Sequence, residues 1–231
     1  MNEHSIEKHF SDIAALIAER SRAIMLWSLL DGRAYTATEL AVTADLSIQS
    51  ASNHLSQLIR GGLLKSEKQG RHKYYRFAND RVALAIENIA GLMPASSSAN
   101  ASANSEPLGI KYARTCYDHL AGKVGVQVTQ SLLKNKWLID CDDRYELSRA
   151  GHKKFSEIGI DVDVAQTQNR KFAYPCLDWS ERTHHLGGAL GAALLNTFIA
   201  NDWIRKVKNS REVVVTGKGM KEFAKSLATS L

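Results

Sequence analysis

The segment from Thr36 to Leu64 constrains the fold of this chain more than any other part of the sequence. Thr36 and Glu39 form a capping-box pattern, in which each side chain satisfies a backbone N–H near a helix start. Ser47 is a second N-cap candidate, and the longer helix that it opens is expected to stop at Gly61-Gly62. The segment therefore predicts a short helix, a turn and a longer helix.

The longer helix is expected to bury its leucines and to expose an unusually polar face. That face carries Ser, Asn, Gln, His and Arg side chains, and Asn and Gln are suited to paired hydrogen bonds with adenine. Ser52, His54 and Arg60 are expected to contact phosphates or the helix packed against this one. The predicted DNA-contacting residues of this helix are Ser47, Gln49, Ser50, Ser52, Asn53, His54, Gln57 and Arg60.

A basic hairpin is predicted directly after this helix. Lys65–Lys68 and Lys73–Phe77 alternate as strands do, and Gln69-Gly70 is expected to form their turn. Residues 60–76 contain six basic residues and one acidic residue, a local net charge of +5 within a chain whose formal charge is +6. Lys68, Arg71 and Lys73 are predicted to contact phosphates. The alternative is a solvated hairpin whose charge serves solubility.

Helices are predicted on both sides of these elements. Ile6–Arg20 has an apolar stripe at helical spacing, and Ser21 is expected to cap a second helix that ends near Leu30. A last helix is predicted over Asn79–Leu92. Helix, helix, helix-turn-helix, hairpin and helix in this order describe a winged helix.

Three motifs in register resemble the arsenic-repressor (ArsR/SmtB) family across residues 8–90. They are Ala18–Leu26 at the entry helix, Leu46–Leu55 in the recognition helix, and Gly62-Leu-Leu with Gly70-Arg-x-x-Tyr-Tyr in the hairpin. The resemblance implies a winged-helix repressor that binds a double-stranded DNA operator as a homodimer. It also implies that the first and last helices form the dimer contacts.

One departure from that family concerns metal binding in the helix pair. Family members with a thiolate site carry Cys-Val-Cys-Asp-Leu at this position, where the present chain has Thr36-Ala-Thr-Glu-Leu40. Because soft thiolate ligands are missing, we predict no metal site here.

Bulk composition excludes other classes of protein. With 231 residues, 44% hydrophobic and 23% charged, the chain has ordinary globular values and room for two cores. No apolar run approaches the ~18 residues that a membrane helix needs, and no secretory signal is recognised at the N-terminus. Three cysteines, an odd number, argue against a disulfide framework and favour the reducing cytoplasm.

The second half of the sequence contains a weak internal repeat. His119-Leu-Ala-Gly122 matches His185-Leu-Gly-Gly188 sixty-six residues later, and Trp137 and Trp203 keep the same offset. Two helix–hairpin–helix repeats are predicted, over residues 109–160 and 172–231. Pro94–Pro107 has no large apolar residue and is interpreted as a linker, or as an extension of the preceding helix.

Reactive side chains gather where each repeat begins. Each group contains a Cys-x-Asp pair followed by histidine. The predicted effector-binding residues are Arg114, Cys116, Asp118, His119, Cys176, Asp178, Trp179, Glu181, Arg182, His184 and His185.

Three interpretations of these residues remain open. A pocket for a small-molecule effector, with arginine as anion clamp and Trp179 as a stacking wall, is preferred. A metal site could use Cys116, His119, Cys176 and either His184 or His185. A redox switch would join the two cysteines. Buried structural polar pairs are the plain alternative. An enzyme using the Cys/His/Asp set is a further one, but no phosphate-cradling glycine loop accompanies it.

The sequence thus predicts a mainly α protein with small β-hairpins (α+β). Residues 1–92 form a winged helix-turn-helix DNA-binding domain, 93–108 a linker, and 109–231 a regulatory domain of tandem helix–hairpin–helix repeats. The expected function is a cytoplasmic, homodimeric, ligand-responsive transcriptional repressor, with activation as the alternative. No cofactor is assigned, no membrane is expected as a partner, and the effector is not identified.

Overall fold

A computed structural model describes residues 3–90, 92, 109–208, 210–229 and 231. The chain divides into two compact units, Met1–Glu87 and Asn88–Leu231, which are described separately. The predicted linker, residues 93–108, lies outside the described residues.

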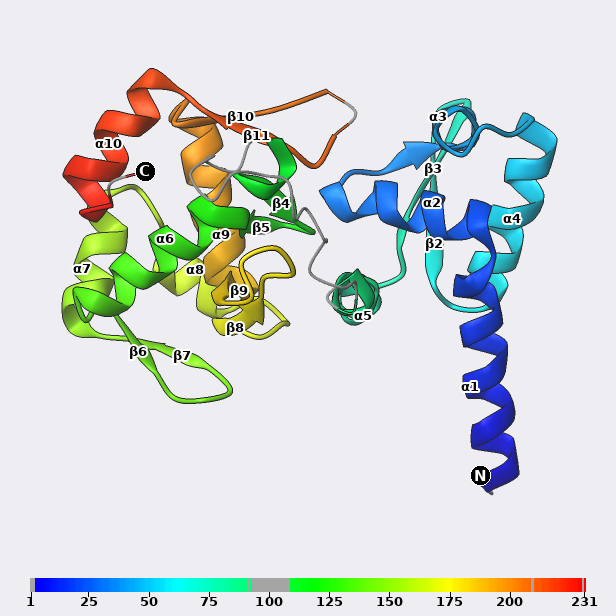
Figure 1. Ribbon diagram of the computed structural model, residues 1–231, viewed down its shortest axis with the longest axis horizontal. Helices are drawn as coiled ribbons and strands as arrows, with labels where there is room; N and C mark the ends of the chain where they lie inside the picture. The colour runs from blue at the N-terminus through cyan, green and yellow to red at the C-terminus, as the bar shows by residue number, and fades with distance from the viewer. Residues whose placement is uncertain (1–2, 91, 93–108, 209, 230) are drawn as a thin grey trace, which may run out of the picture. The chain divides into compact units, whose positions relative to one another are not determined.

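The N-terminal unit is a winged helix (Figure 1). Four helices, a short 3₁₀ turn, a short strand and a hairpin precede a last helix that runs across the unit boundary. The elements are α1 (Glu3–Ala18), α2 (Arg20–Ser28), η1 (Leu29–Asp31), β1 (Tyr35–Thr36), α3 (Ala37–Thr43), α4 (Ile48–Arg60), β2 (Leu64–Gln69), β3 (His72–Phe77) and α5 (Asp80–Ala90). The three strands form an antiparallel sheet in the order β1-β3-β2.

The helix pair α3–α4 begins at the predicted caps. Thr36 Oγ1 accepts a hydrogen bond from the Glu39 N–H, and the Glu39 carboxylate accepts one from the Thr36 N–H. Ser47 Oγ accepts from the Ser50 N–H at the start of α4. Leu55 and Leu58 are fully buried, so α4 packs its apolar side inward and leaves its polar side to solvent.

Several boundaries differ from the sequence predictions. The first helix ends at Ala18, and Glu19, not Ser21, caps α2 by accepting hydrogen bonds from two backbone N–H groups. Serine is a far commoner N-cap than glutamate, so the sequence pattern favours Ser21. Strand β1 was not predicted, because two residues give no periodicity.

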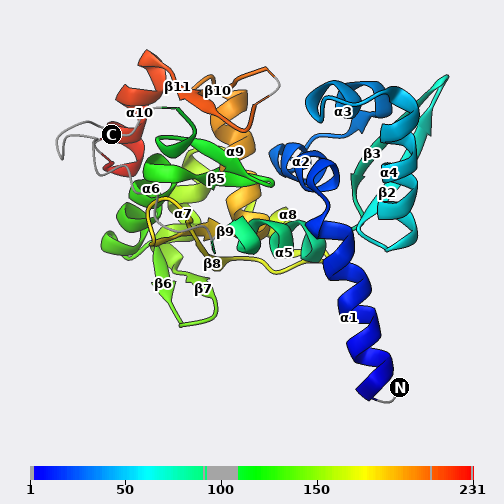
Figure 2. The same ribbon diagram turned by 45° about the vertical axis from the view of Figure 1, so that its right-hand side comes forward.

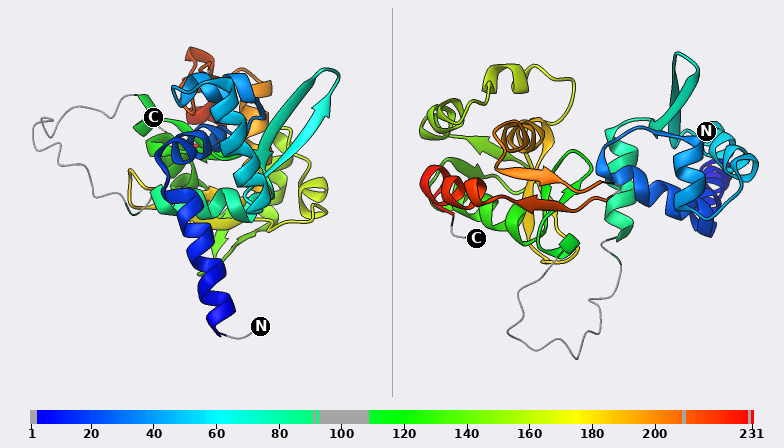
Figure 3. Two further views of the ribbon diagram at one scale, coloured as in Figure 1. Left: turned by 90° about the vertical axis from the view of Figure 1, so that its right-hand side faces the viewer. Right: turned by 90° about the horizontal axis from the view of Figure 1, so that it is seen from above.

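The β2–β3 hairpin projects from the rest of the N-terminal unit (Figures 2 and 3). Its register pairs Leu64 with Phe77 at the buried base and Gln69 with His72 at the tip. Gly70 has φ +59°, a left-handed conformation that glycine adopts without strain. Helix α1 extends away from its own unit, and Phe10 on it is 73% exposed.

The C-terminal unit consists of four hairpins, a short 3₁₀ turn and five helices within the described residues. In chain order they are η2 (Gly109–Lys111), β4 (Arg114–Cys116), β5 (His119–Ala121), α6 (Gly122–Lys134), β6 (Leu138–Asp140), β7 (Tyr145–Leu147), α7 (Arg149–Glu157), α8 (Val162–Gln166), β8 (Tyr174–Leu177), β9 (His184–Gly187), α9 (Gly188–Ala200), β10 (Ile204–Lys206), β11 (Val213–Val215) and α10 (Gly217–Leu227). Each hairpin is an antiparallel pair.

The two halves of this unit have the same order of elements. Hairpin, helix, hairpin and helix occur first as β4–β5, α6, β6–β7 and α7, and again as β8–β9, α9, β10–β11 and α10. The sequence predicted helix–hairpin–helix, and so it missed the hairpin that opens each half. Descent of the two halves from one repeat stays a prediction.

One hydrophobic core serves both halves. Strand β9 of the second half contacts α6 of the first, and β5 of the first contacts α9 of the second. The Leu186 N–H of β9 donates a 2.8 Å hydrogen bond to Thr129 Oγ1 of α6. Phe198, Trp203 and Phe223 pack their rings in the second half of the same core. Among the described residues, no helix is long and apolar enough to span a membrane.

Candidate functional site

The first candidate site is the polar face of α4. Gln49, Asn53, Ser56 and Arg60 are exposed on it, and Ser52 is half-buried. A groove of about 580 Å³ runs between α4 and strand β3, with Lys73 on its far wall. Its lining residues are Asn53, Ser56, Gln57, Ile59, Arg60 and Lys73.

Two predicted contact residues on α4 are already engaged within the unit. Gln57 Oε1 accepts a 2.8 Å hydrogen bond from Arg22 of α2, and the same guanidinium also donates to the Leu16 and Ala15 carbonyls. His54 Nδ1 lies 3.5 Å from a carboxylate oxygen of Glu19. These contacts hold α4 against α2, so both side chains have a structural role in addition to any contact with DNA.

Ser47 and Ser50 form the cap at the start of α4. Besides the backbone bond, their hydroxyl groups lie 3.0 Å apart and share a hydrogen bond. Both are therefore placed at the end of the helix, where backbone N–H groups and the positive end of the helix dipole also point outward. This is the end that a phosphate or a base edge could approach.

The hairpin brings like charges face to face. Lys68 lies directly opposite Lys73, and Lys65 directly opposite Arg76, across the β2–β3 pair. Like charges in this arrangement are destabilising, by a few tenths of a kcal/mol each. Arg76 is partly compensated by Glu67 at 2.8 Å, whereas Lys68 and Lys73 are both exposed beside the exposed Arg71. An anion such as phosphate would relieve the repulsion at the tip.

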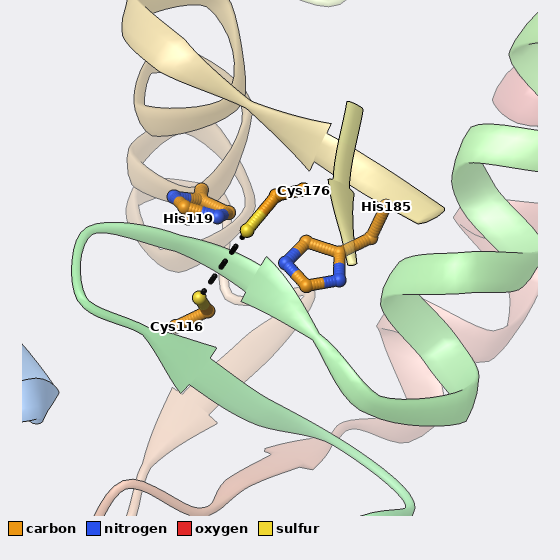
Figure 4. Close-up of side chains that lie close together, drawn as sticks. All are labelled: Cys116, His119, Cys176 and His185. Atoms are coloured by element: carbon orange, nitrogen blue, oxygen red, sulfur yellow. Dashed lines mark hydrogen bonds between the residues drawn. The ribbon is translucent and has the colours of Figure 1, made fainter. Parts of the chain in front are cut away.

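The second candidate site lies inside the C-terminal unit, between the β4–β5 and β8–β9 hairpins. In the first hairpin, Cys116 is directly opposite His119, and in the second, Cys176 is directly opposite His185. Each hairpin therefore presents one thiol and one imidazole. The four side chains converge on a common space between the hairpins (Figure 4). We call these four residues the Cys/His cluster.

The Cys/His cluster is compact and sealed from solvent. The two Sγ atoms lie 3.8 Å apart, and the two imidazole centroids lie 5.1 Å apart. One sulfur or nitrogen atom from each of the four residues lies within 4.8 Å of all the others. All four side chains are at least 97% buried, since none exceeds 3% exposure. Two cysteine sulfurs and two imidazoles are a donor set that Zn²⁺ binds well, the sulfurs then being thiolates.

Each histidine of the cluster has an aspartate beside its Nδ1 atom. His119 Nδ1 lies 3.2 Å from Asp118 Oδ1, and His185 Nδ1 lies 3.2 Å from Asp178 Oδ2. Burial alone would lower the pKa of His119, but the neighbouring Cys116 and Asp118 outweigh burial and raise the pKa to about 10.

Both aspartates are in turn held by arginine. Asp178 accepts hydrogen bonds from Arg114 at 2.8 Å and from the Gly122 N–H at 2.7 Å. Arg170 is bound to Asp118. Burial favours the neutral form of each acid, yet the histidine and arginine partners keep the pKa of both carboxyl groups below the usual range. The aspartates are therefore ionised acceptors that orient the imidazole rings.

The remaining predicted effector residues are distributed around this centre. The Arg114 guanidinium is buried, packs 4.2 Å from the Trp179 ring centroid, and is committed to Asp178. That arrangement leaves it poorly placed to clamp an external anion. Glu181 is half-buried, and its backbone N–H donates to Asp178. Arg182 and His184 are exposed. The structure thus brings His185, not its neighbour His184, into the cluster.

Two features of the site were not found from the sequence. Arg170 lies fifty-two residues from Asp118 in the chain, and no local pattern connects them. The close packing at Gly125 of α6 and Gly191 of α9 is the other feature. A Cβ on Gly125 would lie 2.5 Å from the Leu120 carbonyl and 3.7 Å from His185 Cβ, and a Cβ on Gly191 would lie 2.3 Å from the Leu186 carbonyl and 3.2 Å from His119 Cβ. Each glycine is thus required by the close approach of a carbonyl group from its own half, and the opposite half's histidine packs beside it.

Taken together, a winged helix with an exposed polar recognition helix and a basic hairpin defines a DNA-binding transcriptional regulator. Comparison with known proteins agrees. The chain is 40% identical over 219 residues to the uncharacterized HTH-type transcriptional regulator YdfF of Bacillus subtilis (strain 168). The aligned residues cover 95% of this chain and 97% of that protein. The chain belongs to the HTH-type transcriptional regulators. No protein-family model matches it.

Two solved structures match about two fifths of this chain. Reduced HlyU from Vibrio cholerae is 26% identical and covers 39% of this chain and 94% of its own, with a TM-score of 0.36. A homodimeric DNA-binding domain from Mycobacterium bovis, described as a possible ArsR-family regulator, is 21% identical and covers 38% of this chain and 81% of its own, with a TM-score of 0.34. The family assignment rests on the B. subtilis relative. The observed winged helix is the fold that the ArsR/SmtB resemblance implies.

Proposed function

We propose that this regulator is a homodimeric, ligand-responsive repressor, in which residues 1–92 bind the operator and residues 109–231 receive the signal. The observation that carries the proposal is that α4 exposes a polar face beside a cationic hairpin, and that the two line the same groove. A helix of this kind lies in the major groove and contacts base edges, while the hairpin contacts the backbone.

Within α4, Gln49 and Asn53 are the proposed base-reading residues. Both are exposed, and they lie four residues apart, on neighbouring turns of one helix face. Gln57, one turn further, has its oxygen bound to Arg22 and is proposed to position α4 rather than to choose the sequence. Ser52, His54 and Arg60 remain proposed phosphate or positioning contacts, as do Ser47 and Ser50 at the cap.

Replacing Gln49 or Asn53 by alanine is expected to weaken binding to the operator about tenfold, because each lost base contact is worth ~1–3 kcal/mol. Binding to random duplex should change little. Fluorescence anisotropy with duplexes from the protein's own upstream region, and with shuffled duplexes, measures both. Gln130→Ala, an exposed amide on α6, is the matched control. Equal losses on both duplexes would show that α4 does not read bases.

Dimerisation is proposed to occur through α1. One recognition helix contacts too few bases to be selective, and two helices in successive major grooves lie about 34–36 Å apart. Ile6, Phe10 and Ile13 form an exposed apolar stripe on α1, with 52%, 73% and 43% exposure. A second copy of the same stripe is the occupant that would bury it. Helix α5 is the second proposed dimer contact, from the family resemblance.

Phe10→Glu is expected to raise the dimer dissociation constant at least about tenfold, because burying a phenylalanine contributes ~1.5–3 kcal/mol. Sedimentation velocity over a concentration series measures it. Val164→Glu, which places the same charge on an exposed apolar site of α8, should leave the dimer unchanged. Wild-type protein that stays monomeric at all concentrations would contradict dimerisation through α1.

The C-terminal unit is the proposed receiver of the signal. A ligand that binds one arrangement of the recognition helices better than another would shift DNA affinity. We propose release from DNA as the response, that is, repression relieved by the effector. The C-terminal unit is proposed to serve this regulation, and no catalytic role is proposed for its Cys/His/Asp residues. A DNA-binding protein with buried thiols also fits the cytoplasm.

A further inference from the structure

We propose that the Cys/His cluster binds one Zn²⁺ ion, with Cys116, His119, Cys176 and His185 as its four ligands. The proposal concerns the C-terminal unit and stands independently of how the protein contacts DNA. It assigns these residues to a metal ion, whereas the sequence pattern favoured a small-molecule effector whose identity was left open.

Distances are the first argument. Tetrahedral zinc with Zn–S bonds of ~2.3 Å separates two thiolate sulfurs by about 3.8 Å. Cys116 Sγ and Cys176 Sγ are 3.8 Å apart, whereas a disulfide needs about 2.05 Å. One donor atom from each histidine completes a set in which all four atoms lie within 4.8 Å.

Unsatisfied nitrogen atoms are the second argument. His119 Nε2 and His185 Nε2 are buried and have no hydrogen-bond partner in the described part of the chain. The two histidines are 2% and 1% exposed. A buried polar atom without a partner costs ~1–3 kcal/mol, so each one calls for an explanation, and two such atoms in one cluster of metal-binding side chains point to a ligand. In His119, Nδ1 shares a hydrogen bond with Asp118, so Nε2 is left to bind metal. In His185, neither ring nitrogen has a hydrogen-bond partner among the described residues, and Nδ1 lies 3.2 Å from Asp178, so Nε2 is again the nitrogen that we assign to the metal.

Charge is the third argument. Zn²⁺ with two thiolates and two neutral imidazoles has no net charge, as deep burial requires. Around it, Asp118 with Arg170 and Asp178 with Arg114 are two further neutral pairs. Carboxylates beside Nδ1 are also the usual partners of zinc-bound histidine, because they fix the ring and make Nε2 a better donor.

Four protein ligands leave no open position, so the site is closed in the way that structural zinc sites are. Each hairpin supplies one cysteine and one histidine, and the two hairpins belong to different halves of the unit. The ion would therefore join β4–β5 to β8–β9. Since metal binding contributes free energy only to the folded state, zinc would stabilise this unit.

Elemental analysis of the full-length protein, purified without a polyhistidine tag or metal resin, tests the proposal. We expect about one zinc ion per chain after exhaustive dialysis. Cys116→Ser and Cys176→Ser should lose it, whereas Cys141→Ser, at the half-exposed third cysteine, should keep it. His184→Ala is the control for His185→Ala, because His184 is exposed.

Two further measurements cover variants that fail to fold. His185→Cys keeps four zinc ligands and should retain the ion that His185→Ala loses. Cobalt(II) added to the metal-free wild-type protein should give the intense visible bands of tetrahedral thiolate coordination. Wild-type protein that contains no zinc, and takes up neither zinc nor cobalt, overturns the proposal. So does a Cys116–Cys176 disulfide in such protein, which would favour the redox interpretation instead.

Discussion

Replacing Arg71 and Lys73 together by alanine lowers the slope of log K against log salt by about two units, because two phosphate contacts are lost. At ~0.1 M salt the same loss weakens DNA binding by roughly 100-fold. Both side chains are exposed at the hairpin tip, where Lys73 also faces Lys68. Operator and random duplexes should be affected alike, since phosphates carry no sequence information.

Salt-dependent anisotropy titrations on both duplexes measure this slope. The control is Lys218→Ala with Lys221→Ala, which removes two exposed charges from α10. If the control and the hairpin variant changed the slope equally, only overall charge would matter. An unchanged slope in the hairpin variant would show that the hairpin does not touch DNA. Improved stability of the unbound hairpin variant, by a few tenths of a kcal/mol, should accompany the loss.

Gly219→Ala is expected to destabilise the C-terminal unit by about 3 kcal/mol, the upper end of what overpacking costs. Helix α10 lies so close to the preceding hairpin that a Cβ on Gly219 would be 2.0 Å from the Trp203 carbonyl oxygen and 2.8 Å from its carbon. These are backbone atoms and cannot rotate away. The strain therefore exceeds the ~1 kcal/mol that alanine gains over glycine inside a helix.

Gly217→Ala is a matched control on the same helix. A Cβ there has no atom within 4 Å in the described chain, so this substitution should be neutral or stabilising by ~0.5–1 kcal/mol. Urea unfolding followed by tryptophan emission compares the two, because Trp137, Trp179 and Trp203 all lie in the C-terminal unit. Equal stability of both variants would mean that α10 does not pack on the strand as described. DNA binding at low temperature should survive in each, since α4 belongs to the other unit.

Gly219 has a counterpart in the first half of the C-terminal unit. Its counterpart Gly151 makes the same approach, with a Cβ position 2.0 Å from the Trp137 carbonyl oxygen. The same close contact therefore requires a glycine at both positions, whereas the carbonyl group that it meets is a backbone group. The two glycines thus reflect a packing constraint that both halves share, although the sequence did not show which atoms they contact.

The winged helix was largely determined by local sequence. Its signals are local: capping at Thr36 and Ser47, helical spacing of leucines, and strand alternation after Gly62. Because each acts within a few residues, it can be recognised from the sequence without knowledge of the fold. They located α3, α4 and the β2–β3 hairpin to within one residue at most ends. The exposed polar face of α4 followed from the same spacing, and with it the class of protein.

Only the tertiary structure decided the chemistry of the C-terminal unit. The strands of its opening hairpins are only three or four residues long. The first hairpin turns at Tyr117, with φ +57°, and not at an Asn-Gly pair, so the sequence contains no typical turn signal there. Strand register then placed His185 inward and His184 outward, because successive side chains alternate between faces. Cys116 and Cys176 are sixty residues apart and meet only because each half packs its hairpin against the other's helix. Sequence determined which groups were present, and long-range packing determined which of them became neighbours.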